Sequence, residues 1–203
     1  MPVGNGAVGK TSVARVLDSM SKGLHKNSEI LQKVRKTNNL EFEYITTQQT
    51  IGNIHYIVTL QMLIPPGQKQ IEGDSTGRSF ESVINIYKPF IRRIDVILFT
   101  YDLASRESFH DLVYWVDNIG EIINDATHFI LLGTHLDRIG YQEVTNEDIE
   151  DGMEYLRGAI LDMKPTWKGN CARLEVSNLT GENLQRLLFF ITMSVVSSRK
   201  IIP

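Results

Sequence analysis

The sequence predicts an α/β protein, a three-layer α/β/α sandwich whose central sheet is mostly parallel. Strand-like and helix-like segments alternate along the chain, as they do in layered α/β folds. Three strand-like runs, 95–101, 129–133 and 173–177, are apolar on both faces, which is typical of strands buried between two helical layers. The chain has 203 residues, enough for one domain and short for two, so we expect a single domain over residues 1–203.

The first strand is expected to be short. Only Met1, Pro2 and Val3 precede a glycine-rich loop, and Pro2 has no N–H to donate to a neighbouring strand. Either this strand is a stub, or the natural start of the chain lies upstream of Met1. In both cases we expect the sheet to be weakened at this place. A helix is expected next, from Thr11 to about Met20.

A hairpin is expected in the region that follows. Residues 54–63 alternate between apolar and polar, so this strand should lie nearer an edge of the sheet, with one apolar face. Residues 40–46 can pair with it through a turn at residues 49–53. The apolar face carries Ile54, Tyr56, Val58, Leu60 and Met62.

Three later segments have apolar residues at the spacing of a helix, three and four apart, and their stripes should be core faces. Ligands of such sheets bind at the carboxyl ends of the strands, where the motifs described below fall. The stripes are Phe109, Leu112, Val113, Val116, Ile119 and Ile123; then Ile149, Met153, Leu156 and Ile160; then Leu184, Leu187, Leu188, Ile191 and Val195.

Composition and charge exclude several classes of function. The net charge of −3 argues against binding to nucleic acid, which usually needs a basic excess. The single cysteine, Cys171, rules out a disulfide framework within the chain and favours a cytoplasmic location. No apolar run approaches the ~18 residues of a membrane span. The last residues contain no cysteine, so no C-terminal lipid anchor is expected.

One motif predicts a phosphate site. Residues 4–11 match G-x-x-x-x-G-K-[ST], the loop of P-loop NTPases, in which backbone N–H groups surround phosphate oxygens at the start of a helix. Lys10 should reach the β- and γ-phosphates, and the Thr11 hydroxyl should ligate Mg²⁺. The candidate nucleotide-binding residues here are Gly4, Asn5, Gly6, Ala7, Val8, Gly9, Lys10, Thr11 and Ser12.

With this loop, the sequence resembles the Ras-like small GTPases over nearly its full length. Residues 95–102, followed by Arg106-Glu107-Ser108-Phe109, resemble the fourth strand and third helix of Rab and Ras proteins. The resemblance implies one G domain that binds GTP and GDP with Mg²⁺.

The guanine-reading motif N-K-x-D of the family is matched by Thr134, His135 and Asp137 at the end of an apolar run. The resemblance implies that the Asp137 carboxylate accepts from the guanine N1–H and exocyclic amine. Adenine offers no such pair of donors, and an unpaired buried carboxylate is costly. Thr134 in place of Asn resembles Rho proteins, and His135 in place of Lys resembles the T-H-x-D of Roc domains.

Residues 175–184 resemble the E-x-S-A-K-x-G segment of the family. By this resemblance Ser177 orients the base-binding loop, and the backbone near Asn178 meets the guanine oxygen. Leu179 stands where the family usually has Lys. On its own this segment is also consistent with a cap on the last helix.

Pro65-Pro66-Gly67-Gln68 resembles the switch II segment D-x-x-G-Q. The family role of Gly67 is an N–H contact to the γ-phosphate, and that of Gln68 is to orient the attacking water. Ile64 occupies the position of the Asp, so the acidic partner of Mg²⁺ is missing. Polarity GTPases of the MglA kind also lack this Asp and carry Pro-Gly-Gln.

Two residues are candidates for the switch I threonine that senses Mg²⁺ and the γ-phosphate. Thr37 matches the Rab pattern by its spacing to the following strand pair, and Thr50 matches it by the letters Thr50-Ile51-Gly52. Thr50 leaves no room for a strand before residue 54, so Thr37 is preferred and Thr50 is expected in the hairpin turn.

The segments 21–35 and 69–82 are longer than in the family and are candidate partner surfaces. The basic residues in the first are most simply a solvated face. Arg78, Arg92 and Arg93 are candidates for an arginine finger in cis, and the sequence places none of them.

The resemblance implies a molecular switch that binds GTP and GDP, hydrolyses GTP slowly through Gln68, and meets protein effectors, an exchange factor or a GTPase-activating protein. Ile64, Leu179 and the short first strand motivate an alternative, a nucleotide-binding scaffold with little or no hydrolysis. A P-loop kinase or ATPase would need an acceptor site or a carboxylate after Leu63, and the sequence shows neither.

Overall fold

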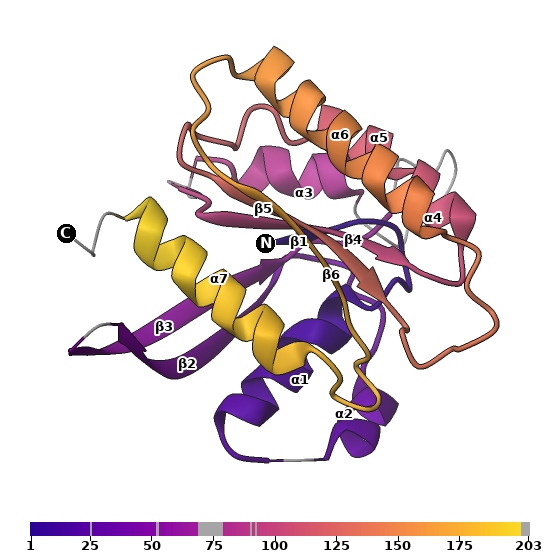
Figure 1. The fold of residues 1–203 in the computed structure, drawn as a ribbon, viewed down its shortest axis with the longest axis vertical. Coiled ribbons are helices and arrows are strands. Elements are labelled where there is room, and N and C mark those ends of the chain that lie inside the picture. Colours follow the sequence, from indigo (N-terminus) through magenta and orange to yellow (C-terminus); the bar gives the residue numbers. More distant parts are fainter. Residues whose placement is uncertain (25, 52, 69–78, 90, 92, 200–203) are drawn as a thin grey trace.

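The computed structural model describes residues 1–24, 26–51, 53–68, 79–89, 91 and 93–199. Strands and helices alternate as predicted (Figure 1). Along the chain they are β1 (Pro2–Val3), α1 (Lys10–Ser21), α2 (Asn27–Lys33), β2 (Glu41–Ile51), β3 (Ile54–Ile64), α3 (Phe80–Tyr87), β4 (Val96–Asp102), α4 (Arg106–His110), α5 (Leu112–Asp117), β5 (His128–Thr134), α6 (Asn146–Met163), β6 (Cys171–Glu175) and α7 (Leu184–Ser198). No helix of this part of the chain is long and apolar enough to cross a membrane.

The central sheet is parallel, with strand order β1-β4-β5-β6, and both of its faces are covered. In β4, Ile97 and Phe99 pack into one core with α3, α5 and α6, whereas Val96 and Leu98 pack into a second core with α1 and α7. Figure 1 shows these two groups of helices on opposite sides of the sheet. The predicted three-layer sandwich is confirmed. Three of the four strands of its central sheet, β4, β5 and β6, overlap the three apolar runs, and β6 begins and ends two residues earlier than the predicted run 173–177.

The first strand is short, as predicted. β1 pairs with β4 only through Pro2 and Val3, opposite Leu98 and Phe99. The hairpin β2–β3 forms a separate antiparallel sheet. A strand of two residues, one of them a proline, has few backbone groups left to hydrogen-bond a second neighbour. The central sheet and the hairpin are therefore separated at β1, the strand at which the sequence predicted a weakened sheet.

The hairpin is longer and its turn tighter than expected. Its ladder continues to Ile51 opposite Ile54, so the turn does not occupy residues 49–53. Thr50 consequently lies in strand β2, opposite His55, and not in the turn. The expected apolar face is buried only toward the core end, at Leu60 and Met62. The other end of the hairpin extends away from the sheet (Figure 1).

The apolar stripe at 109–123 forms two short helices and not one. Helix α4 ends at His110, and α5 ends at Asp117. The Asn118 side-chain amide donates to the Tyr114 carbonyl (2.8 Å), so it caps the last turn of α5. Ile119 lies beyond this helix but is fully buried. The spacing of the apolar residues therefore predicted correctly that Ile119 is buried, but not that it belongs to a helix.

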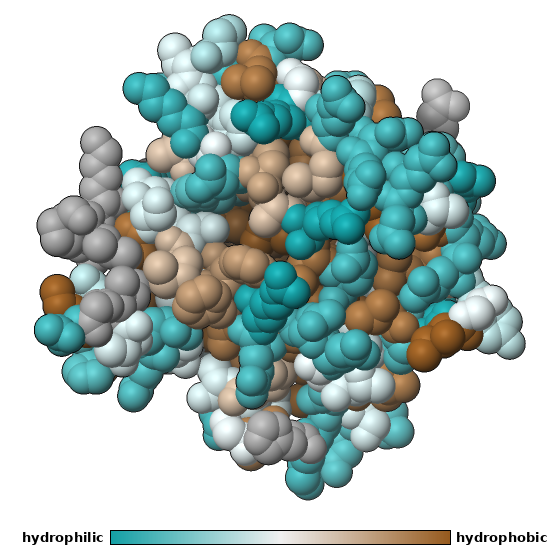
Figure 2. All heavy atoms as spheres, viewed as in Figure 1, coloured by the Kyte–Doolittle hydropathy of each residue, from teal (hydrophilic) through white to brown (hydrophobic). Residues whose placement is uncertain are grey.

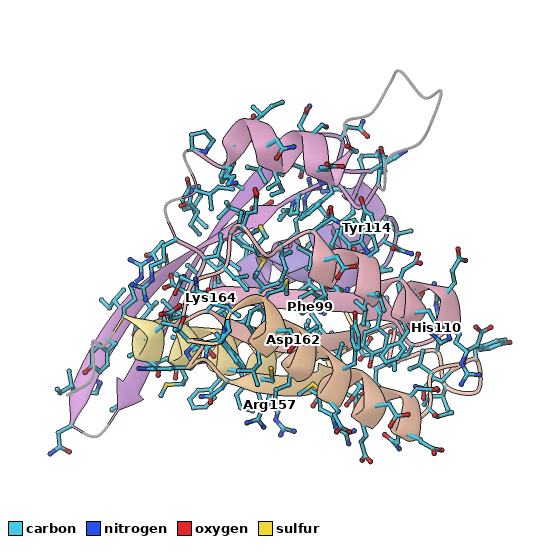
Figure 3. All side chains as sticks on the ribbon, turned by 90° about the horizontal axis from the view of Figure 1, so that it is seen from above. Phe99, His110, Tyr114, Arg157, Asp162 and Lys164 are labelled. Atoms are coloured by element: carbon cyan, nitrogen blue, oxygen red, sulfur yellow. The ribbon has the colours of Figure 1, made fainter. Side chains whose placement is uncertain are left out.

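The central strands lie in the interior, whereas both polar and some apolar side chains are exposed at the surface. Seen from above, Phe99 of β4 lies in the middle of the molecule, whereas His110 and Arg157 lie at its outline (Figure 3). In the space-filling view, apolar residues on the displayed face show between hydrophilic ones (Figure 2). The helices thus turn their apolar stripes toward the sheet, which leaves the loops at the strand ends to form the site.

Candidate nucleotide-binding site

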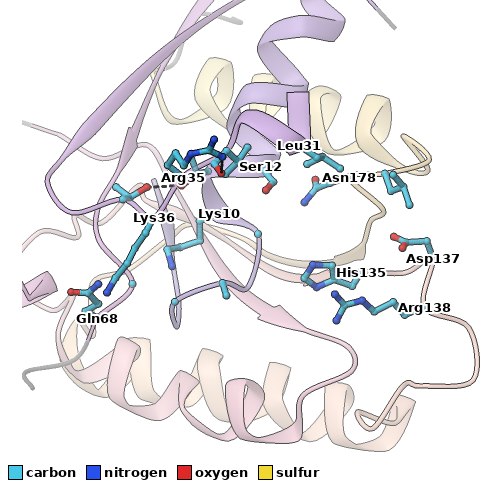
Figure 4. Close-up of a pocket in the computed structure, with 18 residues that line it drawn as sticks. Lys10, Ser12, Leu31, Arg35, Lys36, Gln68, His135, Asp137, Arg138 and Asn178 are labelled. Carbon is cyan, nitrogen blue, oxygen red and sulfur yellow. Dashed lines mark hydrogen bonds between the residues drawn. The ribbon is translucent and has the colours of Figure 1, made fainter. Parts of the chain in front are cut away.

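A cavity of about 780 Å³ opens where β1, β3, β5 and β6 end. Most of the predicted site residues line it: Gly6, Ala7, Gly9, Lys10, Thr11, Ser12, Thr37, Gly67, Gln68, His135, Asp137, Asn178 and Leu179. The remaining predicted residues, Gly4, Asn5, Val8, Thr134 and Ser177, are not among the lining residues and instead hold them in place. In Figure 4, Lys10 and Gln68 lie at one end of the cavity, here called the phosphate end. His135, Asp137 and Asn178 lie at the other, here called the base end.

The loop 4–11 adopts a backbone shape that needs glycine. Gly4 has φ 145° and passes so close to β4 that a Cβ would lie 2.1 Å from the Thr100 carbonyl oxygen. Gly9 has φ 92°, a left-handed conformation that strains any other residue. Ala7 also has a positive φ, 65°, at the exposed tip of the loop. Helix α1 begins at Lys10, within this motif, so its N-terminus faces the cavity.

Asn5 fixes the loop to the helical layer. Its side-chain amide donates to Asp111 (2.6 Å), and its side-chain oxygen accepts from the Trp115 indole N–H (2.9 Å). Trp115 is fully buried and makes an edge-on contact with Phe80 at the start of α3. The loop is therefore joined by side-chain contacts to the helix that follows residues 65–68.

Lys10 is 6% exposed and donates to the carbonyls of Gly4 (2.7 Å) and Asn5 (2.5 Å). Burial lowers its pKa to about 7, because the ammonium loses the water that would surround it in the unfolded chain. Gly67 is pressed against this lysine, since a Cβ there would lie 2.2 Å from Nζ. An anion at this end would offset the uncompensated charge.

The two predicted metal-binding hydroxyls meet. Thr11 Oγ1 lies 2.7 Å from Thr37 Oγ1, and both residues are buried. Thr50 is far along the hairpin, where its hydroxyl contacts the His55 ring (2.8 Å) on an exposed surface. The structure therefore brings Thr37, and not Thr50, to the phosphate loop.

The residues after β3 complete the phosphate end. Ile64 is fully buried in the core and supplies no oxygen. The Gln68 backbone carbonyl accepts from the N–H of Phe80 (3.0 Å), and its side chain lines the cavity. Its Nε2 is buried and has no hydrogen-bond partner among the described residues. An unpaired amide of this kind can donate to or position a ligand.

At the base end, Asp137 is held by Ser177. The Ser177 hydroxyl donates to Asp137 Oδ1 (2.5 Å) and accepts from the Thr180 N–H (3.0 Å). Thr134 is fully buried and donates to the Val8 carbonyl (2.7 Å), with the Tyr101 carbonyl at 2.9 Å. Thr134 therefore connects the base end to the phosphate loop.

His135 is fixed beside Asp137 in a left-handed conformation with φ 59°. Its Nδ1 lies 2.8 Å from Asp102 Oδ2, and Arg138 approaches the same oxygen at 3.3 Å. Leu179 is half exposed at the rim of the cavity. The contact with Asp102 holds the imidazole of His135 beside the end of β4.

A model of the Ras family matches residues 1–193. The chain belongs to the Ras family. It is also 28% identical over 144 residues to the human EF-hand calcium-binding domain-containing protein 4B, a match that covers 70% of this chain and 16% of that protein. The chain thus spans only a small part of the length of this relative. Family membership makes it a GTP-binding, switch-like protein.

The residues of this Ras family member fit a guanine nucleotide and Mg²⁺. Backbone at Gly4 and Gly67 comes closer to Thr100 and Lys10 than a Cβ allows, and the buried Lys10 ammonium has no carboxylate partner in the described part of the chain. Adjacent ligands of an octahedral Mg²⁺ lie about 2.9 Å apart, and the two threonine hydroxyls have a similar spacing. No group of three His, Cys, Asp or Glu side chains suited to a metal occurs among the described residues.

Several residues that the sequence did not single out also line the cavity. They are Leu31 and Val34, the basic pair Arg35 and Lys36, and Arg138. The basic residues of segment 21–35 were expected to be a solvated face. Arg35 is exposed, as expected, but it also borders the cavity, because α2 brings this segment back over the phosphate loop. The sequence feature that could have indicated this position is that Arg35 lies two residues before Thr37.

Of the three candidate arginine fingers, only Arg93 lies among the described residues, and it is held away from the site. Arg93 pairs with Asp95 (2.8 Å) and donates to the Ser198 carbonyl, which ties it to α7. It is not among the residues that line the cavity. Arg78 and Arg92 lie outside the described residues, as does most of segment 69–82.

Proposed function

We propose that this chain is a molecular switch that binds GTP and GDP with Mg²⁺ and hydrolyses GTP slowly. The observation that carries the proposal is that one cavity joins a buried phosphate-loop lysine, Lys10, to a positioned carboxylate, Asp137. The first suits the phosphates. The second suits the two donors of guanine and leaves adenine without a match.

In this mechanism the chain holds and orients GTP. The loop 4–11 and Lys10 bind the phosphates, and the N–H of Gly67 contacts the γ-phosphate. Gln68 orients the water that attacks the γ-phosphorus in line, and the bond to the β–γ bridging oxygen breaks. Thr11 and Thr37 would hold Mg²⁺, which would neutralise part of the phosphate charge. Turnover should be slow, because the candidate arginine finger Arg93 is held by Asp95 and the Ser198 carbonyl and does not line the cavity.

The change between a GTP-bound and a GDP-bound form depends on the loops that carry Thr37 and Gln68. Each belongs to a loop that contacts the phosphate end, and only GTP supplies a γ-phosphate to both. We propose that protein effectors read the ordered form of these loops and that an exchange factor or a GTPase-activating protein resets it. A cytoplasmic location remains a prediction.

The first experiment is calorimetry with GDP and GTP, with and without Mg²⁺, and with ATP as competitor. We expect tight binding that ATP does not displace and that Asp137→Asn abolishes. Displacement of GDP by equimolar ATP would exclude guanine recognition and revive the reading as a P-loop ATPase or kinase. No binding of either nucleotide would overturn the proposal.

A second candidate is a scaffold that binds nucleotide without hydrolysing it. The burial of Ile64 favours it, because this apolar side chain stands where the family has the Asp that supports Mg²⁺. Single-turnover hydrolysis of GTP by the wild-type chain and by Gln68→Ala separates the two functions. A measurable rate that falls in the variant supports the switch, and no rate in either protein supports the scaffold. A rate that Gln68→Ala leaves unchanged would show that Gln68 has no catalytic role.

A further inference from the structure

The side-chain amide of Asn178 makes no hydrogen bond within the described part of the chain. The residue is 4% exposed, and both its amide nitrogen and its amide oxygen are buried without a hydrogen-bond partner among the described residues. Such an amide forgoes the hydrogen bonds that water would give it in the unfolded chain. The neighbouring Ser177, by contrast, has its hydroxyl fully engaged.

The place of this amide is defined by its neighbours. A Cβ added to Gly9 would lie 3.0 Å from Asn178 Nδ2 and 3.6 Å from the methyl carbon of Thr134. The amide thus lies over the end of the phosphate loop, beside Thr134, and it lines the same cavity as Asp137 (Figure 4). Thr134 itself presents a methyl group on this side, because its hydroxyl donates to the Val8 carbonyl.

We propose that the Asn178 side-chain amide reads the base of the bound nucleotide by donating to the acceptor edge of guanine, which consists of O6 and N7. This inference rests on the proposed function, in which Asp137 takes the two donors of guanine. The polar atoms then left on the opposite edge are both acceptors. An amide NH₂ carries two donors and no charge, so it matches that edge. Thr134 cannot serve it, since its hydroxyl is used.

The test is calorimetry with GDP and two analogues, on the wild-type chain and on Asn178→Ala. The first analogue, 7-deaza-GDP, lacks the N7 acceptor, and the second, 6-thio-GDP, weakens the acceptor at position 6. On the wild-type chain at least one analogue should bind about tenfold more weakly than GDP. On Asn178→Ala that penalty should vanish. If each analogue shows the same penalty on both proteins, the Asn178 amide does not read the base.

Inosine diphosphate serves as the internal control. It keeps O6 and N7 but lacks the exocyclic amine, so its penalty should report on Asp137 and should be the same with and without Asn178. A wild-type chain that fails to bind GDP would overturn the proposed function. Tight GDP binding that Asp137→Asn abolishes would support the proposed function. If the affinity loss of each analogue is then the same on the wild type and on Asn178→Ala, only this inference is overturned.

Stability gives a second readout that does not involve nucleotide. Because Asn178→Ala removes an unpaired buried amide, the nucleotide-free variant should melt at the same temperature as the wild type or about 2 to 4 °C higher. Its further stabilisation by saturating GDP should nevertheless be smaller. A variant that melts lower without nucleotide would show that the amide has a structural partner and would contradict the inference.

Asn183 offers a matched control in the same segment. Its amide donates to the Glu175 carbonyl (2.8 Å), and its φ of 59° suits glycine. Asn183→Gly should lower the melting temperature of the nucleotide-free chain and leave every ratio between GDP and its analogues unchanged. A change in those ratios would mean that the loop as a whole, and not the Asn178 amide, sets base preference.

Discussion

The two ends of the cavity differ in how their polar groups are satisfied. At the phosphate end, Lys10 donates to loop carbonyls, and Thr11 and Thr37 contact each other. At the base end, Asp137 is held by Ser177, whereas the Asn178 amide has no partner among the described residues. At the phosphate end, Lys10, Thr11 and Thr37 must exchange internal bonds for bonds to a ligand, and only Gln68 Nε2 has no internal bond to give up among the described residues. The base end can gain new ones, so the two ends should respond differently to substitution.

The largest effect is expected at Lys10. Lys10→Met removes a charge-assisted contact to phosphate, so the affinities for GDP and GTP should both fall about 100-fold or more. Calorimetry measures this loss. The nucleotide-free variant should be more stable than the wild type, because a buried ammonium without a carboxylate partner is costly. A variant that keeps wild-type affinity would place the phosphates elsewhere.

The same lysine predicts a pH dependence. Its folded-state pKa of about 7 lies below its ordinary value of 10.5, so between these limits the unfolded chain binds more protons at this site than the folded chain does. Stability of the nucleotide-free chain should therefore rise with pH from 7 to about 10, by at most ~1.4 kcal/mol per pH unit from this group. Urea unfolding of Lys10→Met, set against the wild type, should lack this rise. A parallel rise in both proteins would assign it to other groups.

Gln68 separates binding from chemistry at the phosphate end. Gln68→Ala should slow single-turnover GTP hydrolysis on the order of 10- to 100-fold, because the attacking water loses its orientation. GDP affinity should stay within about twofold, since Gln68 is assigned to the water and not to GDP. An equal loss of GDP affinity would instead make Gln68 a binding residue.

A comparison of Thr37 with Thr50 sharpens the metal assignment. Thr37→Ala should weaken GTP binding in Mg²⁺ about tenfold and have little effect when Mg²⁺ is chelated. Thr50→Ala is the matched control, because its hydroxyl contacts only His55 in the described structure and borders no part of the cavity. An effect of Thr50→Ala equal to that of Thr37→Ala would contradict the proposed metal site.

Much of the fold could be predicted from local patterns. Apolar runs and their alternation identified the strands, because burial on one or both faces leaves a direct mark on sequence. The glycines of the phosphate loop were equally readable, since Gly4 has no room for a side chain beside Thr100. The end of α5 at Asp117 was not visible, because buried residues such as Ile119 keep helical spacing after α5 has ended.

The parts that could not be predicted depend on how distant segments fold back on each other. Residues 34–40 carry no periodic pattern, so the sequence could prefer Thr37 to Thr50 only by its spacing to the strand pair. The contact between Thr37 and Thr11 became visible only in the structure. Arg35 resembled any exposed arginine until α2 brought it to the cavity. The unpaired state of Asn178 is likewise invisible in sequence, because it depends on every neighbour that fails to reach the amide.

The smallest effect is expected at Thr134, the residue that joins the two ends. Thr134→Val keeps the shape of the side chain but removes the donor to the Val8 carbonyl, at a cost of about 1 kcal/mol. The melting temperature should fall by roughly 2 to 4 °C, and GDP affinity by about fivefold, as the phosphate loop loosens. The ratio of affinities for GDP and 7-deaza-GDP should stay constant, because the hydroxyl faces the loop and not the base. If that ratio changes, Thr134 reads the base itself, and the division of labour between Thr134 and Asn178 is reversed.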